Sequence, residues 1–368
     1  MAKAKKTKSI LTEQSYKFLK NYINNPSPTG FESSGQKIWL EYIKPFTDSF
    51  FTDPYGTAVG VINPTAPFKV VIEAHADEIS WFVNYISDNG LIYLKRNGGV
   101  DHQVAPAKRV LIHGKKGAVK AVFGWPAIHT RIANPDNKEP QPKVDNLFLD
   151  CGARNKKEVE ALGIHIGAVA TYEEGYEELA YDYLIGRAFD NRIGGFMIAE
   201  VARLLKENKK KLPFGLYVVN AVQEEVGLRG AEMVARRIKP DVAIITDVTH
   251  DTTTPMINKI IEGDCACGKG PSLAFGPAVH NKLLNIVQTV AEKNKIPVQM
   301  RTVSRSTGTD TDSFAYANEG CPSVLISIPL RYMHTPVEML HKDDIENTIK
   351  LMYETLLTLT PKTNLSYF

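Results

Sequence analysis

The sequence has 368 residues, more than most single domains, and its 43% apolar and 23% charged residues are typical of a globular protein. This composition argues against a disordered or fibrous protein. No stretch approaches the ~20 apolar residues of a membrane-spanning helix, and no apolar segment follows the first lysines, so we expect neither membrane insertion nor secretion.

The formal net charge is +3, and several positive charges lie at the start of the chain. Without interleaved aromatic residues or a recognition motif, they indicate a solvated terminus rather than a nucleic-acid site. We therefore expect no nucleic-acid partner. The residues concerned are Lys3, Lys5, Lys6 and Lys8.

Four cysteines without a CxxC pattern fit a reducing compartment, so we expect a cytoplasmic protein. Cys151 and Cys321 are expected to be small buried residues. Cys265 and Cys267 are close enough in sequence to bind a metal, but no second pair or histidine lies near them, which disfavours that alternative.

The predicted elements begin with a helix at residues 12–25, where apolar and aromatic residues recur at helical spacing before a Pro- and Gly-containing stop. A second helix is predicted at 34–43 and a buried strand at 68–74. Residues 84–181 then change to short Val, Ile and Leu runs broken by glycines and by a polar loop at 134–142. This texture predicts a small β-barrel inserted into a larger domain.

Beyond the barrel, helices and strands alternate along the chain. This alternation predicts an α/β fold with a mixed, largely parallel sheet sandwiched by helices. The larger domain would then comprise residues 1–83 and 182–368. The helices are predicted at 193–207, 231–238 and 281–294, and the strands at 214–222, 242–245 and 323–328.

Side chains that bind metals follow the carboxyl ends of the predicted strands. In open α/β sheets ligands bind outside these ends, so the side chains are expected to converge on one site. Two histidines with several carboxylates form the nitrogen and oxygen set that suits a pair of zinc-like ions. The residues are His75, Asp77, Glu224, Glu225, Asp247 and His334, joined from a loop by Asp190.

Each residue also has an ordinary structural interpretation. Asp190 could cap the following helix, Asp247 could begin a turn, and His334 could be a loop histidine with satisfied hydrogen bonds. Glu224 and Glu225 could be a solvated pair, although adjacent carboxylates are costly to bury unless cations neutralise them. The metal site is favoured because, without it, each of these separate structural roles would have to place a metal-binding side chain near the same edge of the sheet by coincidence.

Six segments match one family as a set, in the family's order and over nearly the whole chain. They are Ser27-Pro28-Thr29-Gly30-Phe31-Glu32, Ala74-His75-Ala76-Asp77-Glu78-Ile79, Phe189-Asp190-Asn191-Arg192, Gln223-Glu224-Glu225-Val226-Gly227, Gly308-Thr309-Asp310 and Arg331-Tyr332-Met333-His334-Thr335-Pro336. In these segments the chain resembles the M42 metallo-aminopeptidases of the co-catalytic zinc peptidase clan. The resemblance implies a zinc-peptidase fold, with residues 1–83 and 182–368 catalytic and 84–181 an oligomerisation barrel.

The resemblance further implies a metal-dependent aminopeptidase that releases the first residue of short peptides. Two divalent ions are expected in each subunit, zinc foremost and cobalt or manganese as alternatives. Subunits are expected to form homo-oligomers, from dimers to a tetrahedral dodecamer. The implied ligands are Asp190 as the bridge, His75 and Asp247 at one ion, and Glu225 and His334 at the other.

Glu224 is the implied general base, and Asp77 the implied partner that orients His75. The implied substrate-binding residues are Gly308, Thr309 and Asp310. The clan often has a cis bond after the bridging aspartate, so the Asp190–Asn191 bond is expected to be cis.

The chain departs from the family at Ser80, where glycine is common, and at Thr307 and Thr311, which flank the Gly-Thr-Asp segment. No ligand is lost, but the substrate preference stays open. Two other interpretations are a catalytically inactive scaffold of the same fold, and a glycoside hydrolase, whose chemistry needs two carboxylates flanking a sugar.

Overall fold

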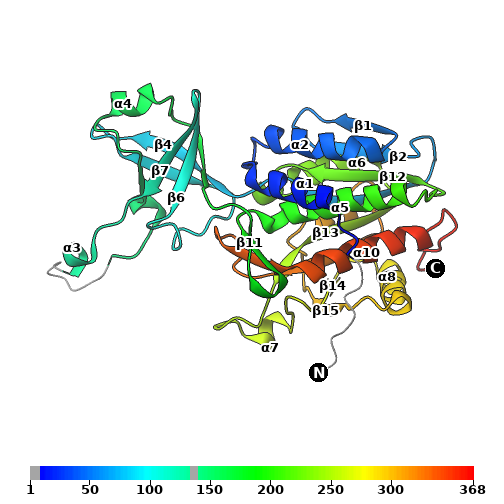
Figure 1. Ribbon diagram of the computed structural model, residues 1–368. Helices are drawn as coiled ribbons and strands as arrows, with labels where there is room; N and C mark the ends of the chain where they lie inside the picture. Colours follow the sequence, from blue (N-terminus) through cyan, green and yellow to red (C-terminus); the bar gives the residue numbers. More distant parts are fainter. Residues whose placement is uncertain (1–8, 133–139) are drawn as a thin grey trace.

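The computed structural model describes residues 9–132 and 140–368, so the lysine cluster and most of the predicted polar loop lie outside the described residues. The described chain forms a large α/β unit and a smaller barrel that projects from it (Figure 1). No described helix is both long and apolar enough to cross a membrane.

The large unit is built on an eight-stranded sheet with the order β1-β2-β12-β3-β13-β16-β14-β15. The four central strands are parallel, whereas β2 and β14 join them antiparallel on either side. The predicted mixed, largely parallel sheet is confirmed. The strands are β1 Ser49–Thr52, β2 Ala58–Ile62, β12 Gly215–Ala221, β3 Lys69–His75, β13 Val242–His250, β16 Ser323–Leu330, β14 Ser272–Phe275 and β15 Gln299–Thr302.

Helices cover both faces of this sheet. Gly194 of α5 lies against Ala74 of β3, and α1, α2 and α10 pack on α5. The next residue back along β3, Glu73, points to the opposite face, where it meets Asp310 at the start of α9. The helices are α1 Glu13–Asn24, α2 Ser33–Ile43, α5 Phe189–Glu207, α6 Arg229–Ile238, α8 Asn281–Asn294, α9 Thr311–Ala315 and α10 Lys342–Thr358.

The barrel closes in the order β4-β5-β8-β7-β6-β9 and has its own apolar core, with Trp81 packed edge-on against Phe123. Its first strand begins at Ser80, ahead of the predicted boundary at 84; the division into domains at 84 and 181 stays a prediction. The strands are β4 Ser80–Ile86, β5 Ile92–Asn97, β6 Arg109–Gly114, β7 Gly117–Phe123, β8 Phe148–Asp150 and β9 Val169–Tyr172.

Short elements connect the two units and the surface loops. The strands β10 and β11 lie on the return of the chain from the barrel, and β11 pairs with β17 of the large unit in a small sheet. The remaining elements are β10 Glu177–Glu178, β11 Tyr183–Gly186, β17 Glu338–His341, α3 Ile128–Ile132, α4 Lys156–Ala161, α7 Lys259–Glu262 and the 3-10 helices Lys44–Phe46, Val144–Asn146, Ala180–Asp182 and Glu224–Val226.

Two elements differ from the sequence prediction near the expected site. The apolar run at 242–245 predicts a strand that ends there, but β13 continues to His250 because β16 runs alongside it to Leu330 and supplies ladder partners. Asp247 therefore lies inside a strand. The helix α5 is assigned from Phe189, but Asp190 and Asn191 have non-helical backbone angles, so its regular part begins close to the predicted residue 193. The predicted cis bond between Asp190 and Asn191 is confirmed.

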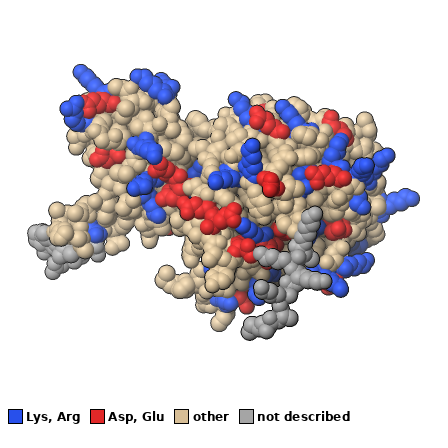
Figure 2. Space-filling view, viewed as in Figure 1, with Lys and Arg blue, Asp and Glu red and all other residues tan. Residues whose placement is uncertain are grey.

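The remaining surface and cysteine predictions have mixed outcomes. Cys321 is buried as expected, and so are Cys265 and Cys267, but Cys151 is only half-buried. On the face drawn in Figure 2, lysine and arginine side chains are spread over both units, while acidic side chains gather where the barrel meets the large unit.

Candidate active site

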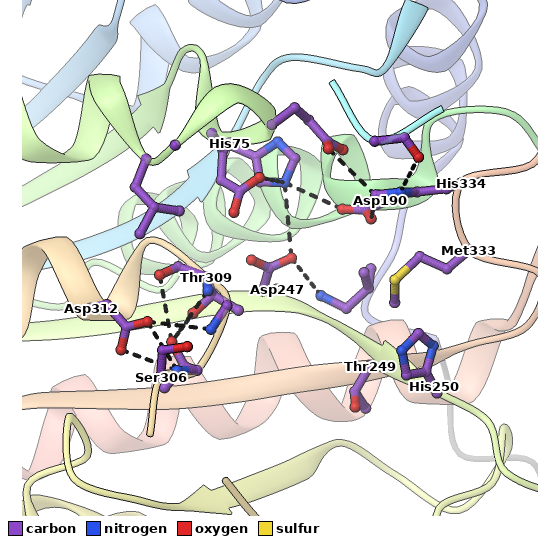
Figure 3. A pocket seen from close by; sticks show the side chains of 18 of the residues that line it. His75, Asp190, Asp247, Thr249, His250, Ser306, Thr309, Asp312, Met333 and His334 are labelled. Carbon is purple, nitrogen blue, oxygen red and sulfur yellow. Dashed lines mark hydrogen bonds and ion pairs between the residues drawn. The ribbon is translucent and has the colours of Figure 1, made fainter. Parts of the chain in front are cut away.

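The predicted metal-binding side chains converge at the carboxyl edge of the central strands (Figure 3). His75 is the last residue of β3, and Asp247 projects from the neighbouring strand β13. Glu224 and Glu225 form the short 3-10 helix that follows β12. The remaining two residues are Asp190, at the start of α5, and His334, in the loop between β16 and β17.

Asp190 lies between the two histidines. Its Oδ1 is 3.3 Å from Nε2 of His75, and its Oδ2 is 3.3 Å from Nε2 of His334. Asp247 Oδ1 lies 3.9 Å from His75 Nε2, and Glu225 Oε2 lies 3.4 Å from His334 Nε2. Among the described residues, three groups of side chains could each hold a metal ion, and two of them share the carboxylate of Asp190. The third group is His75, Glu224 and Glu225.

The carboxylate of Asp77 contacts both His75 and the backbone of the Glu224–Glu225 pair. Its Oδ1 is 3.3 Å from Nδ1 of His75, and its two oxygens accept hydrogen bonds from the backbone N–H groups of Glu224 and Glu225 at 3.0 and 3.2 Å. The hydroxyl of Thr29 also donates to it. Asp77 is fully buried, so these contacts fix the His75 ring and the glutamate pair relative to each other.

Glu338 has the same role on the other side of the site, and the sequence analysis missed it. Its carboxylate oxygens accept the backbone N–H groups of Asp190 at 3.0 Å and of His334 at 2.9 Å. The side chain is 2% exposed at the start of β17. A carboxylate four residues after His334, at the start of an apolar strand, was the available signal.

The barrel also reaches the site, through the turn after β5. The carbonyl oxygen of Gly99 lies 3.0 Å from Nδ1 of His334. A Cβ added at Gly99 would come within 2.8 Å of the His334 ring, and one added at Gly98 would meet Cβ of Glu225 at 3.2 Å. The two glycines therefore allow the barrel backbone to pack directly on the site.

A cavity of about 640 Å³ opens over these residues, a size that suits a small-molecule or short-peptide ligand. Of the predicted substrate-binding residues, Gly308 and Thr309 line it. Asp310 does not; it is 1% exposed and lies behind the wall, beside Glu73. The cavity is also lined by residues that the sequence analysis did not select, among them His250, Arg301, Asp312 and Met333.

Comparison with known proteins places this geometry in a family. The family model described as M42 glutamyl aminopeptidase matches residues 56–351. The chain belongs to the M42 aminopeptidases. The resemblance inferred from the motifs is thereby confirmed, and so is the enzyme class, because the family and its relatives are hydrolases that act on peptide bonds.

Individual M42 relatives match over nearly their whole length. The lysyl aminopeptidase of Pyrococcus furiosus is 32% identical over 94% of this chain and 98% of its own. The TET aminopeptidase of a Thaumarchaeota archaeon from marine sediment has a TM-score of 0.91 at 30% identity, covering 95% of this chain and 98% of its own. The TET1 peptidase of Pyrococcus horikoshii has a TM-score of 0.83 at 26% identity, with coverage of 94% and 100%.

The electrostatics of this M42 site fit bound cations. Burial, with like charge from Asp247 and Glu225, raises the pKa of Glu224 to about 10. Burial likewise raises the pKa of Asp247 to about 7. Such shifts mark carboxylates that water cannot solvate and that need a positive charge nearby to remain ionised.

The histidines of the M42 site point to the same conclusion. Burial acts to lower the pKa of His334, but contacts with Asp190 and Glu225 outweigh it and raise the pKa to about 12. Neither ring nitrogen of buried His75 has a hydrogen-bond partner of good geometry among the described residues, although carboxylate oxygens surround it. Nitrogen and oxygen atoms left in this state form the donor set that divalent metals prefer.

Proposed function

We propose that this chain is a binuclear metal-dependent aminopeptidase that releases amino-terminal residues from short peptides. The observation that carries the proposal is the position of Asp190, which presents one oxygen to each histidine at the same distance of 3.3 Å. A single carboxylate shared between two such groups suits a pair of ions rather than one.

The proposed ligands follow from this arrangement. Asp190 would bridge the ions, His75 and Asp247 would complete one site, and Glu225 and His334 would complete the other. The nitrogen and oxygen donors suit zinc, and cobalt or manganese would compete for the same positions. When bound, the ion pair would supply a water molecule acidic enough to lose its proton near neutral pH and would polarise the peptide carbonyl.

Glu224 is the proposed general base. It lines the cavity with a side chain 11% exposed, and its Oε2 lies 3.8 Å from His75 Nε2. Neither of the two candidate metal groups that share Asp190 needs Glu224 as a member. The carboxylate would accept a proton from the attacking water and return it to the leaving amine. Asp77, which accepts the Glu224 backbone N–H, holds this side chain over the cavity.

The test is replacement of Glu224 by Gln, which keeps the shape of the side chain and removes its basicity. Hydrolysis of an aminoacyl p-nitroanilide should fall by about a thousandfold, within the range for a lost general base. Elemental analysis should still find two metal equivalents per chain. Glu262→Gln, on exposed α7, is the matched control and should match the wild type.

Two outcomes of this test would count against the proposal. Substantial remaining activity in the Glu224 variant would remove it from the role of base. A wild-type protein that binds no stoichiometric metal and hydrolyses no aminoacyl substrate would instead favour the inactive scaffold.

We also propose that this chain assembles into a homo-oligomer, as one of its relatives does. The TET1 peptidase of P. horikoshii can assemble into a tetrahedron or a large octahedral shell. A homo-oligomer of this kind predicts a particle far heavier than the 40.9 kDa chain in light scattering after gel filtration. The proposed cytoplasmic location is open to test by cell fractionation.

A further inference from the structure

The cavity contains one side chain whose charge the proposed chemistry does not use. Arg301 is the only lysine or arginine among the described residues that line it. The other charged lining residues are acidic and lie mostly at the proposed metal centre. A cation at this place is unexpected unless it has an anionic partner.

Arg301 projects from β15, at the edge of the main sheet, and extends back toward the site. Its Nη2 lies 3.2 Å from Oγ of Ser327 on β16, so the side chain crosses β14, which lies between these strands. Ser327 is paired with Asp247 in the β13–β16 ladder. The guanidinium is therefore about 5 to 10 Å from the proposed metal centre, one or two strand spacings away.

Arg301 is half-buried, and its guanidinium lacks the carboxylate partner that two buried arginines of this chain have. Arg187 pairs with Glu78, and Arg203 pairs with Glu200. No described carboxylate lies within ion-pair distance of Arg301, and its Nε is buried without a hydrogen-bond partner among the described residues. Partial burial of an unpaired charge is costly, so a carboxylate that enters the cavity would gain a partner that is already partly desolvated.

Asp312 is the other charged side chain in this part of the cavity, but its carboxylate already accepts hydrogen bonds from the backbone. Asp312 accepts hydrogen bonds from the backbone N–H groups of Thr307, at 2.9 and 3.1 Å, and of Gly308, at 3.3 Å. These bonds shape the loop that forms the cavity wall. Asp312 is therefore a structural acceptor, whereas Arg301 has donors to spare.

From this contrast we propose that Arg301 binds a substrate carboxylate and gives the enzyme a preference for peptides that begin with Asp or Glu. The inference rests on the proposed aminopeptidase function and names its substrate class. Family membership leaves this open, since the family description names a glutamyl enzyme and the P. furiosus relative is a lysyl one.

The carboxylate could belong to the first side chain or to the carboxyl terminus of a dipeptide. The Arg301 side chain extends over β14, where its ladder partner Ala274 is fully buried, so we infer that the sheet closes this end of the cavity. A closed end suits a side chain that stops there, whereas the peptide chain must continue toward the opening. We therefore assign the carboxylate to the first residue of the substrate.

The experiment compares the metal-loaded enzyme on the p-nitroanilides of Glu, Asp, Leu and Lys. For the wild type, kcat/KM should be highest on Glu or Asp. Arg301→Met should lower kcat/KM on these two by about a hundredfold, the effect of a lost charge-assisted pair, and lower it far less on Leu. Arg301→Lys should lose part of the preference, and Arg305→Met, on the exposed loop outside the cavity, should keep all of it.

Each alternative gives a distinct result. Metal-loaded wild type that cleaves none of the four substrates would count against the aminopeptidase function itself. Cleavage without a preference for Glu or Asp, or an equal loss on Glu and Leu in Arg301→Met, would overturn the assignment of Arg301 alone. If Arg301→Met has no activity even on the Leu substrate, the Arg301→Lys variant provides the test. An Arg301→Lys enzyme that keeps the full preference for Glu or Asp over Leu would reject the assignment.

A further comparison separates the two sources of the carboxylate. Leu-Gly carries a carboxyl terminus, and Leu-Gly amide does not. If Arg301→Met loses activity on Leu-Gly but not on the amide, Arg301 binds the carboxyl terminus, and the preference for an acidic first residue is wrong.

Discussion

The two histidines of the proposed metal centre are held in different ways. His75 ends a central strand, is 1% exposed and has its Nδ1 beside buried Asp77. His334 lies on a loop in the left-handed backbone region, with a φ of 61°, and its side chain is 32% exposed. Its ring faces a carbonyl of the barrel, and its backbone is held by Glu338.

The difference shows that, apart from the bridging Asp190 at the start of α5, the sheet builds one half of the site. The other two members of the His75 half, His75 and Asp247, need only neighbouring parallel strands, whose ends meet by topology. The His334 half needs a loop, the start of β17 and a turn of the inserted barrel to be in place together. The barrel is thus part of the site's support as well as the proposed oligomerisation unit.

Replacement of Asp190 by Asn should have the largest effect, because this side chain belongs to both halves. A neutral amide cannot bridge two cations, so we expect fewer than two metal equivalents per chain. Several kcal/mol of transition-state stabilisation would be lost, which corresponds to more than about a thousandfold in kcat/KM. Elemental analysis measures the metal content, and p-nitroanilide hydrolysis measures kcat/KM.

Asp264→Asn is the control for this variant, because that aspartate is 75% exposed and pairs only with Lys259. It should behave as the wild type. An Asp190→Asn enzyme that retains two tightly bound ions would show that the bridge is not the shared element of the two halves.

Replacement of Glu338 by Gln should affect the His334 half most, because Glu338 holds both His334 and the bridging Asp190 and reaches the His75 half only through Asp190. The amide offers one acceptor oxygen where the carboxylate uses two, so either the Asp190 or the His334 backbone N–H loses its partner. Loss of such an orienting group typically lowers metal affinity or activity by about 10- to 100-fold. Metal titration followed by calorimetry should show the His334 site weakened more than the His75 site.

Glu319→Gln, on an exposed turn, is the matched control. Equal weakening of both sites by the Glu338 change would mean that the two halves are not independent. No weakening would mean that Glu338 serves the fold rather than the site.

The same contrast explains what the sequence could predict. The apolar runs before His75 and before Glu224 identify strands, and parallel strands bring their ends together, so this half follows from pattern and topology. The elements were predicted with similar success: α8 has the predicted bounds, and the sheet is mixed and largely parallel as expected.

The supports of the other half have at most weak local signals in the sequence. Glu338 and Gly99 act through contacts with residues that are distant in sequence, and neither belongs to a repeating apolar pattern. Arg301 was missed for a related reason. From sequence alone, an arginine on a short edge strand is expected to be solvated, and only the order of the strands shows that its side chain lies over β14. His334 itself was selected because it follows the predicted strand at 323–328, and the family motif then supported that choice.

A methyl group at Gly99 should have the smallest effect and test the barrel's contribution most directly. The added Cβ of Gly99→Ala would lie 2.8 Å from Cε1 and Nδ1 of His334, so the ring or the turn must shift. The proposed ligand His334 would be displaced while His75 is untouched, and we expect about tenfold weaker binding at one metal site only.

Gly117→Ala is the control for an added methyl in the barrel. Gly117 has a φ of 114°, where alanine is strained, but its new Cβ would meet nothing within 4 Å. This variant should lower the melting temperature slightly and leave metal affinity unchanged, because strain in the β6–β7 hairpin does not reach the site. If Gly99→Ala behaves in the same way, the barrel supports the fold alone, and the His334 half depends on the large unit as completely as the His75 half does.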